Sequence, residues 1–282
     1  MSDVTLTAAL RSNLLSLQGT QKLLDSTQLR LATGLKVNSA LDNPSSYFAA
    51  QSLNNRAGDL NNLLDGMGQA VQVLKATDEA IKAITSLLQQ AQAVAQDAKD
   101  ALAGGSTDVT SQAASFDEII AQVDGLAGDS SYRGTNLINA ATTTALTVNF
   151  SESSTSSASQ LVIAGVDFKS ASGGGDLTVS DSGGDFADVT AAQGAIDDIK
   201  ADLATIRAQA ATFGSNLSII QTRQDFTQNL INVLREGSDK LTLADKNEEG
   251  AKLLSLQTSQ QLGITSLSLA SQANQSILRL FQ

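Results

Sequence analysis

Three small groups of carboxylates come closest, in type and spacing, to a catalytic site. Asp197 and Asp198 precede Asp202, and Glu248 is followed directly by Glu249, so either group could be drawn as a carboxylate pair for general acid–base chemistry. Adjacent acidic residues on a helix point in different directions, however, and they are usually solvated. We therefore interpret both groups as helix surface and not as catalytic residues.

The third group, Asp181, Asp185 and Asp188, lies in a Gly-rich stretch and could offer oxygen ligands to a cation. Its spacing does not match an EF-hand loop, so ordinary loop polarity is the better interpretation. The 282 residues include no His and no Cys, which excludes His-based triads, thiolate nucleophiles and the usual zinc sites. The sequence predicts a protein that is not an enzyme and that binds no metal or cofactor.

Composition limits the kinds of partner and of fold that are expected. With 29 acidic and 18 basic residues the net charge is −11, so no nucleic-acid partner is expected. No apolar run approaches the roughly 20 residues that cross a bilayer, and the first residues lack the features of a Sec signal peptide, so we expect no membrane insertion and no such signal. An aromatic share of only 4%, with no Trp, favours long helices packed through Leu, Ile, Val and Ala.

The elements that would position these residues begin with an N-terminal helix expected to end near Ser39. Its leucines recur at steps of three, four and seven, the spacing of one apolar stripe on a helix. They are Leu6, Leu10, Leu14, Leu17, Leu24 and Leu31. Because the other faces are mostly Ser, Gln, Asn and Thr and carry little charge, the segment should be only marginally stable alone.

Pro44, preceded by the capping residue Asn43, suits the first turn of a second helix. Its apolar seam predicts a helix over 45–102 that ends at Gly104 and Gly105, and residues 111–125 read as a shorter helix.

The middle of the chain, residues 142–188, is rich in Ser and Gly. It contains strand-like pieces at 146–150, 161–163 and 177–179, which predict two or three short strands on a surface excursion. A disordered loop is the alternative. Because the excursion adds little to the helical seams, replacing residues 151–185 by a short linker is expected to leave assembly intact.

The following helix carries the clearest period, with alternating steps of three and four from Ile196 to Leu241. The positions are 196, 199, 203, 206, 210, 213, 217, 220, 224, 227, 231, 234, 238 and 241, of which eleven of fourteen are apolar. This is the pattern of a coiled coil, and its partner would be the helix that begins at Pro44.

The last helix, from about Asp245, has two overlapping apolar stripes. One consists of Leu253, Leu256, Leu267, Ala270 and Ile277, and the other of Leu254, Ile264, Leu278 and Phe281. One N-terminal helix cannot cover both, which implicates other subunits. The predicted fold class is mainly α: an elongated antiparallel helical or coiled-coil bundle built from both termini, with a small β-containing central excursion.

Three segments resemble motifs of the bacterial flagellins. Residues 30–42 resemble R-L-S-S-G-L-R-I-N-S-A-x-D, residues 133–138 are similar to F-N-G-x-N-L-L, and residues 272–281 are similar to Q-A-N-Q followed by L-x-L-L. The matching positions are Arg30, Leu31, Gly34, Asn38, Asp42, Gly134, Asn136 and Asn274. Asn43-Pro44 is similar to a variant in alphaproteobacterial flagellins, whereas residues 240–246 depart from the family's S-R-I-x-D-A-D.

The resemblance implies a structural subunit that self-assembles into the helical flagellar filament for swimming, as an open homopolymer outside the cell. It also implies type III export, with the export apparatus, a flagellin chaperone and the filament cap as partners. A hook–filament junction protein of the same appendage is the alternative. The expected subunit-interface residues are Leu6, Leu10, Leu14, Leu17, Leu24, Leu31, Leu254, Ile264, Leu267, Ile277, Leu278 and Phe281.

Five segments follow from the resemblance and the periodicity together. An N-terminal inner-core helix is expected at 1–40 and outer rod helices at 41–141. The variable β or loop excursion covers 142–188, a second outer rod helix covers 189–244, and a C-terminal inner-core helix covers 245–282.

Overall fold

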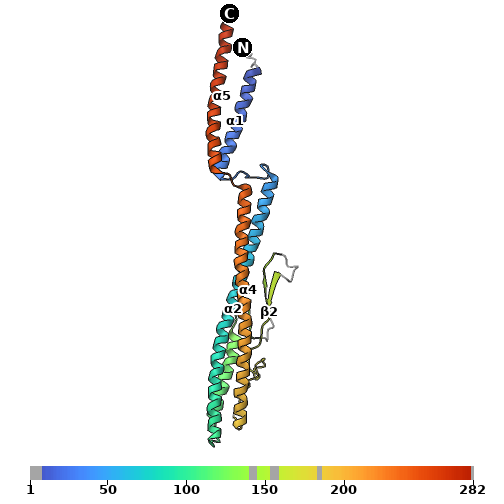
Figure 1. Ribbon diagram of the computed structural model, residues 1–282, viewed down its shortest axis with the longest axis vertical. Coiled ribbons are helices and arrows are strands. Elements are labelled where there is room, and N and C mark those ends of the chain that lie inside the picture. The colour runs from blue at the N-terminus through green and yellow to red at the C-terminus, as the bar shows by residue number, and fades with distance from the viewer. Residues whose placement is uncertain (1–7, 140–144, 153–158, 183–185, 281–282) are drawn as a thin grey trace. The chain divides into compact units, whose positions relative to one another are not determined.

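The computed structural model describes residues 8–139, 145–152, 159–182 and 186–280, and Figure 1 shows its elements. These residues form five helices and one small sheet. The order is α1 (Ala8–Thr33), α2 (Pro44–Ala103), α3 (Thr110–Asp129), β1 (Leu146–Asn149), β2 (Gln160–Ile163), α4 (Val189–Thr242) and α5 (Lys246–Leu280). The expected class, mainly α with a small β-containing part in the middle of the chain, is confirmed.

The chain forms two compact units. The terminal unit consists of residues 1–57 and 232–282, and the central unit consists of residues 58–231. α2 and α4 each contribute residues to both units. The predicted division into five segments is a finer one and stays a prediction.

The start of α2 is set by the two residues identified in the sequence. Asn43 accepts the amide N–H of Ser46 on its side chain at 3.1 Å and that of Tyr47 on its carbonyl at 3.0 Å. These bonds satisfy amide groups that a helix start leaves unpaired, and Pro44 has no N–H to satisfy.

α1 ends at Thr33, six residues before the expected end near Ser39. The reason is Gly34, which adopts a φ of 73° while its N–H donates to the carbonyl of Arg30 at 2.8 Å. A left-handed glycine after the last helical residue is a common helix terminator. The chain then leaves the helix axis and runs along the end of α4.

The period on α4 is confirmed as the seam of the bundle. Each of the fourteen predicted positions is buried or half-buried. In the central unit this seam packs with Ile84, Leu88 and Ala91 of α2 and with Phe116 of α3 in one hydrophobic cluster. The steps of three and four therefore located the core of the central unit from sequence alone.

The sheet is an antiparallel pair in which Leu146 lies opposite Ile163. The third strand-like piece, residues 177–179, is not a strand. Instead, the amide N–H groups of Thr178 and Val179 donate to the carboxylate of Asp202 on α4, at 2.8 and 2.9 Å. The buried carboxylate of Asp202 therefore supplies the hydrogen-bond acceptors that a neighbouring strand would provide.

Part of the described middle segment packs into the core instead of forming only a surface excursion or a disordered loop. Ile163, Phe168, Leu177 and Val179 are buried, and Phe186 packs edge-on against Phe116 with ring centroids 5.3 Å apart. Asp124 on α3 fastens the segment as well, because it accepts the N–H and the hydroxyl of Ser170 at 2.6 and 2.8 Å.

A tight turn follows α3. The backbones of Tyr132 and Thr135 exchange two hydrogen bonds of 2.9 and 3.0 Å, and Arg133 and Gly134 between them have φ angles of 51° and 82°. Such two-residue turns need positive φ at both central positions, which suits Asn-Gly. Arg133 is held there by a hydrogen bond of 3.0 Å from its guanidinium to Gln69.

We expect Arg133→Asn to stabilise the central unit, because Asn adopts this conformation with less strain than Arg. The gain should be about 1 kcal/mol, which is the low end of the strain for an L-residue in this region. Urea unfolding of the variant measures it. The same substitution is also made in a Gln69→Ala background, where Arg133 has no hydrogen bond to Gln69 to lose. If Arg133→Asn lowers the free energy of unfolding in both the wild-type and the Gln69→Ala backgrounds, the prediction is wrong.

Candidate subunit interface

In the terminal unit α1 packs side by side with α5 (Figure 1). The helices are closely packed at Gly263, where an added Cβ would lie 3.1 Å from Cγ of Leu17. Nearby, the side chain of Gln260 donates to that of Gln21 at 2.6 Å. Glycine at this point lets the two backbones come together.

The predicted leucines of α1 that are described lie largely on the side turned away from solvent. Leu24 is buried, Leu17 and Leu31 are half-buried, and Leu14 is exposed. Leu6 lies outside the described residues, as does the side chain of Leu10. The predicted stripe is thus mainly the surface that α1 turns toward α5.

α1 carries a second row of leucines that sequence reasoning missed. Leu15 is 67% exposed, Leu23 is 58% exposed, and Leu29 is also exposed. At 100° per residue these positions lie on the half of the helix that faces away from Leu24. A helical-wheel count of every leucine, and not only those at steps of three, four and seven, would have found this row.

The two stripes predicted on α5 separate in the structure. Leu253, Leu256, Leu267 and Ala270 are half-buried, whereas Leu254 and Ile264 are exposed by 67% and 49%. Leu262 and Leu269, which were not predicted, are exposed as well. The side chains of Asn274, Ile277 and Leu278 lie outside the described residues, and so does Phe281.

Few side chains are fully buried in this helix pair. Among the described residues of α1 only Leu24 and Thr27 are buried, and in α5 only Glu249 is. A pair of helices without a third layer leaves one face of each open to solvent. Rows of exposed leucines on such open faces mark a surface for association.

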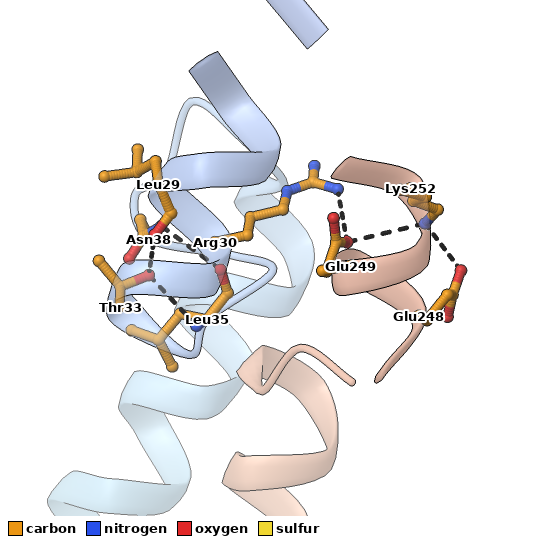
Figure 2. A network of polar contacts seen from close by, with 8 residues as sticks. All are labelled: Leu29, Arg30, Thr33, Leu35, Asn38, Glu248, Glu249 and Lys252. Atoms are coloured by element: carbon orange, nitrogen blue, oxygen red, sulfur yellow. Dashed lines mark hydrogen bonds and ion pairs between the residues drawn. The ribbon is translucent and has the colours of Figure 1, made fainter. Parts of the chain in front are cut away.

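The base of the helix pair carries a polar cluster, shown in Figure 2. The Glu249 side chain is only 6% exposed, and its Oε1 lies 3.4 Å from Nη1 of Arg30 and 3.7 Å from Nζ of Lys252. Within the described structure Oε2 of Glu249 has no hydrogen-bond partner. Lys252 also binds the exposed Glu248 at 2.7 Å. Arg30 is therefore the closest countercharge to a buried carboxylate.

We expect Arg30→Ala to loosen the α1–α5 pair. Loss of a contact to a buried charged group costs about 1.5 to 3 kcal/mol. Hydrogen exchange of residues 15–30 and 250–270 measures the change. Glu248→Gln is the matched control, since exposed ion pairs contribute about 0 to 1 kcal/mol. Equal effects of Arg30→Ala and Glu248→Gln would contradict the prediction.

The remaining motif residues hold turns. The Gly34 carbonyl accepts the N–H of Ala244 at 2.9 Å, and residues Leu35 and Leu243 pair across the two linkers. The Asp42 carboxylate accepts the N–H groups of Asn38 and Ser39 at 2.9 and 3.0 Å, and these bonds lower the pKa of Asp42.

Asn136 is buried and donates to the carbonyls of Ala127 and Gly128 at the end of α3, at 2.8 and 3.1 Å. Gly134 completes the tight turn before it. Every described motif residue thus has a local structural role, and the motif positions do not converge on a ligand.

The acidic groups have structural roles as well. Asp202 is buried, which corrects the expectation of a solvated surface, and its oxygens are occupied by the amides of Thr178 and Val179. Asp197 pairs with Lys200 at 2.9 Å, and hydrogen bonds from Gln193 and then Lys200 lower its pKa. Burial, followed by the charges of Asp202 and Asp197, raises the pKa of Asp198.

Asp188 caps α4 by accepting the N–H of Ala191 at 2.8 Å, whereas Asp185 lies outside the described residues. Across the part of the chain that the structure describes, no three His, Cys, Asp or Glu side chains are grouped to hold a metal ion. In the same residues, no helix has the length and hydropathy of a membrane span.

The terminal helices expose leucines to water, and the polar motif residues shape turns. These are the features of a structural protein that associates through its helices. The family model described as bacterial flagellin N-terminal helical region matches residues 4–143. Flagellin FljM of Caulobacter vibrioides is 30% identical over 95% of this chain and 94% of its own. The chain belongs to the bacterial flagellin family.

Other relatives agree. A flagellin of Brucella melitensis is 29% identical over the full length of both chains, and flagellin C of Rhizobium meliloti is 49% identical over 73 residues, which are 26% of this chain and 23% of that one. A solved Bacillus cereus flagellin is 19% identical, covering 56% of this chain and 86% of that one with a TM-score of 0.43. These relatives include alphaproteobacterial flagellins, as the Asn43-Pro44 variant suggested.

Flagellins are structural subunits of the flagellar filament and not enzymes, so the interpretation that excluded catalysis is confirmed. The alternative, a hook–filament junction protein, is not favoured, because relatives matched over nearly their whole length are flagellins.

Proposed function

We propose that this flagellin polymerises through the exposed apolar rows of α1 and α5, which pack against the terminal helices of neighbouring copies in the filament. The observation that carries the proposal is the pair of rows formed by Leu15 and Leu23 on α1 and by Leu254 and Ile264 on α5, all exposed. Burying a leucine or isoleucine side chain contributes about 1.5 to 3 kcal/mol, so contacts repeated in every subunit would strongly favour the polymer.

This proposal keeps the predicted interface and enlarges it. Three of the predicted residues are exposed and available to a neighbour: Leu14, Leu254 and Ile264. Four others are buried or half-buried and would hold α1 and α5 together beneath the interface: Leu17, Leu24, Leu31 and Leu267. Leu6, Leu10, Ile277, Leu278 and Phe281 are retained as interface residues on the sequence prediction alone. Leu15, Leu23, Leu262 and Leu269 are added on their exposure.

Family membership supports a proposal for the location and the partners. The filament lies outside the cell, and its subunits would leave through the flagellar type III export apparatus with the help of a flagellin chaperone, before the filament cap guides assembly. Marginal terminal helices suit this route, because a chain that is to pass through a narrow channel must unfold easily. Swimming motility is the proposed biological role.

The test compares the wild type with a Leu254→Gln, Ile264→Gln double variant in purified form. The variant removes two apolar side chains from the open face of α5 and leaves the half-buried face unchanged. Two such losses amount to at least about 3 kcal/mol, so the critical concentration for polymerisation should rise at least about a hundredfold. Sedimentation and electron microscopy measure it.

Leu254→Met, Ile264→Met is the matched control, because it changes the same two positions and keeps them apolar. It should polymerise like the wild type. Normal filaments from the Gln variant would refute the proposed interface, and a wild-type protein that forms no filaments under any assembly condition would refute the proposed function.

A further inference from the structure

Leu41 is 95% exposed and lies in a hydrogen-bonded turn just before α2. Its own N–H donates to the Ser39 hydroxyl at 3.3 Å, and Asp42 accepts the N–H groups of Asn38 and Ser39. A leucine on a mobile loop could fold back onto the protein. On this fixed turn Leu41 instead projects into solvent as an apolar knob.

A cleft of about 360 Å³ lies in the same terminal unit, between the linker, the first turns of α2 and the end of α4. Its lining includes the buried Val37 and Ala50 and the half-buried Tyr47, with Asn54 and Asp239 among the polar residues. An apolar cavity of about 150 Å³ accommodates benzene, so this cleft has room for a leucine side chain. Leu41 is not among the residues that line it.

We infer that Leu41 of one copy inserts into this cleft on a second copy of the chain. The inference rests on the proposed function, since filament subunits bring many copies of the terminal unit together. The knob and the cleft are formed by different residues, so the same contact can repeat from copy to copy along an open helical polymer, which is the arrangement that a filament needs.

The second copy is the occupant because the knob and the cleft belong to the unit that also presents the leucine rows of α1 and α5. The contact therefore continues the interface proposed for assembly. It would add a specific contact to a surface otherwise made of interchangeable leucines, and so would select one arrangement of neighbouring subunits.

The first experiment measures the critical concentration of Leu41→Gln. We expect a rise of about tenfold or more, because the loss of one buried leucine contact per subunit has that effect. Leu41→Met keeps the knob apolar and should stay near the wild type. The thermal unfolding of the monomer should be unchanged, since Leu41 makes no buried contact within its own chain.

The second experiment uses the absence of native Cys in the chain. Leu41→Cys and Gln51→Cys, the latter at a lining position of the cleft, are purified separately and assembled as a 1:1 mixture. Oxidation or a short bismaleimide should then link the two variants in mixed filaments, whereas filaments of either variant alone and mixed monomers should remain unlinked.

Each other outcome overturns the inference. Unchanged polymerisation of Leu41→Gln shows that no knob is needed. Linkage within filaments of Leu41→Cys alone places two knobs together and indicates a two-fold contact. If the wild type polymerises but these results fail, only this inference is lost, whereas a wild type that does not polymerise removes the proposed function too.

Discussion

Removal of residues 262–282 abolishes polymerisation and leaves the central unit folded: this is the result we expect from the truncated protein. The deletion takes away Leu262, Ile264 and Leu269, which are exposed on α5. Three buried contacts of this kind contribute about 4.5 to 9 kcal/mol per subunit, so assembly becomes undetectable at any practical concentration. Circular dichroism and electron microscopy of the same sample measure helix content and filaments.

The truncation leaves residues 58–231 intact, so the unfolding transition of the central unit should stay at the wild-type temperature. The companion variant, Leu262→Gln with Leu269→Gln, makes the same face of α5 polar and keeps the chain length. Filaments of normal length from the truncated protein would show that α5 is not required and that assembly relies on other surfaces.

Replacing residues 151–185 by a short linker should strongly destabilise the central unit, contrary to the expectation from its Gly- and Ser-rich sequence. The replacement removes Ile163, Phe168 and Leu177 from the core and leaves apolar groups of α3 and α4 uncovered. Truncation of a single buried Phe costs about 3 to 5 kcal/mol, and about 1 kcal/mol lowers the Tm of such a domain by roughly 2 to 4 °C. We expect a drop of more than about 10 °C.

Phe168→Ala isolates this effect without changing the chain length, and it should lower the Tm by about 10 °C. Val162→Ala is the matched control, because Val162 belongs to β2 in the same segment but is exposed. A linker variant with the wild-type Tm would show that the segment contributes nothing to the fold, as its composition suggests.

The helices could be predicted from sequence because their signals are local and repeated. The heptad from Ile196 to Leu241 spans thirteen steps, and Asn43 with Pro44 marks the start of α2, so both elements were located to within a few residues. The end of α1 was misplaced because one residue, Gly34, overrides a helical pattern that continues after it.

The middle segment could not be predicted because its folding depends on long-range partners. Thr178 and Val179 look like part of a strand, but their amides bind Asp202, which is 24 residues away from Thr178 in the chain. In the sequence, Asp202 looks like a member of the acidic group with Asp197 and Asp198, which was interpreted as solvated. The exposed row of Leu15 and Leu23 was missed for a different reason, since the stronger stripe through Leu24 on the same helix concealed it.

One contact in the terminal unit has a mechanical consequence. The Ser238 hydroxyl of α4 is buried, donates to the carbonyl of Ala50 at 3.3 Å and accepts from Asn54 of α2 at 2.8 Å. A seam made only of Ala, Leu and Ile would let two helices slide by one turn at modest cost, whereas a one-turn slip here leaves the buried Ser238 hydroxyl unpaired. These two hydrogen bonds therefore resist sliding of α2 along α4.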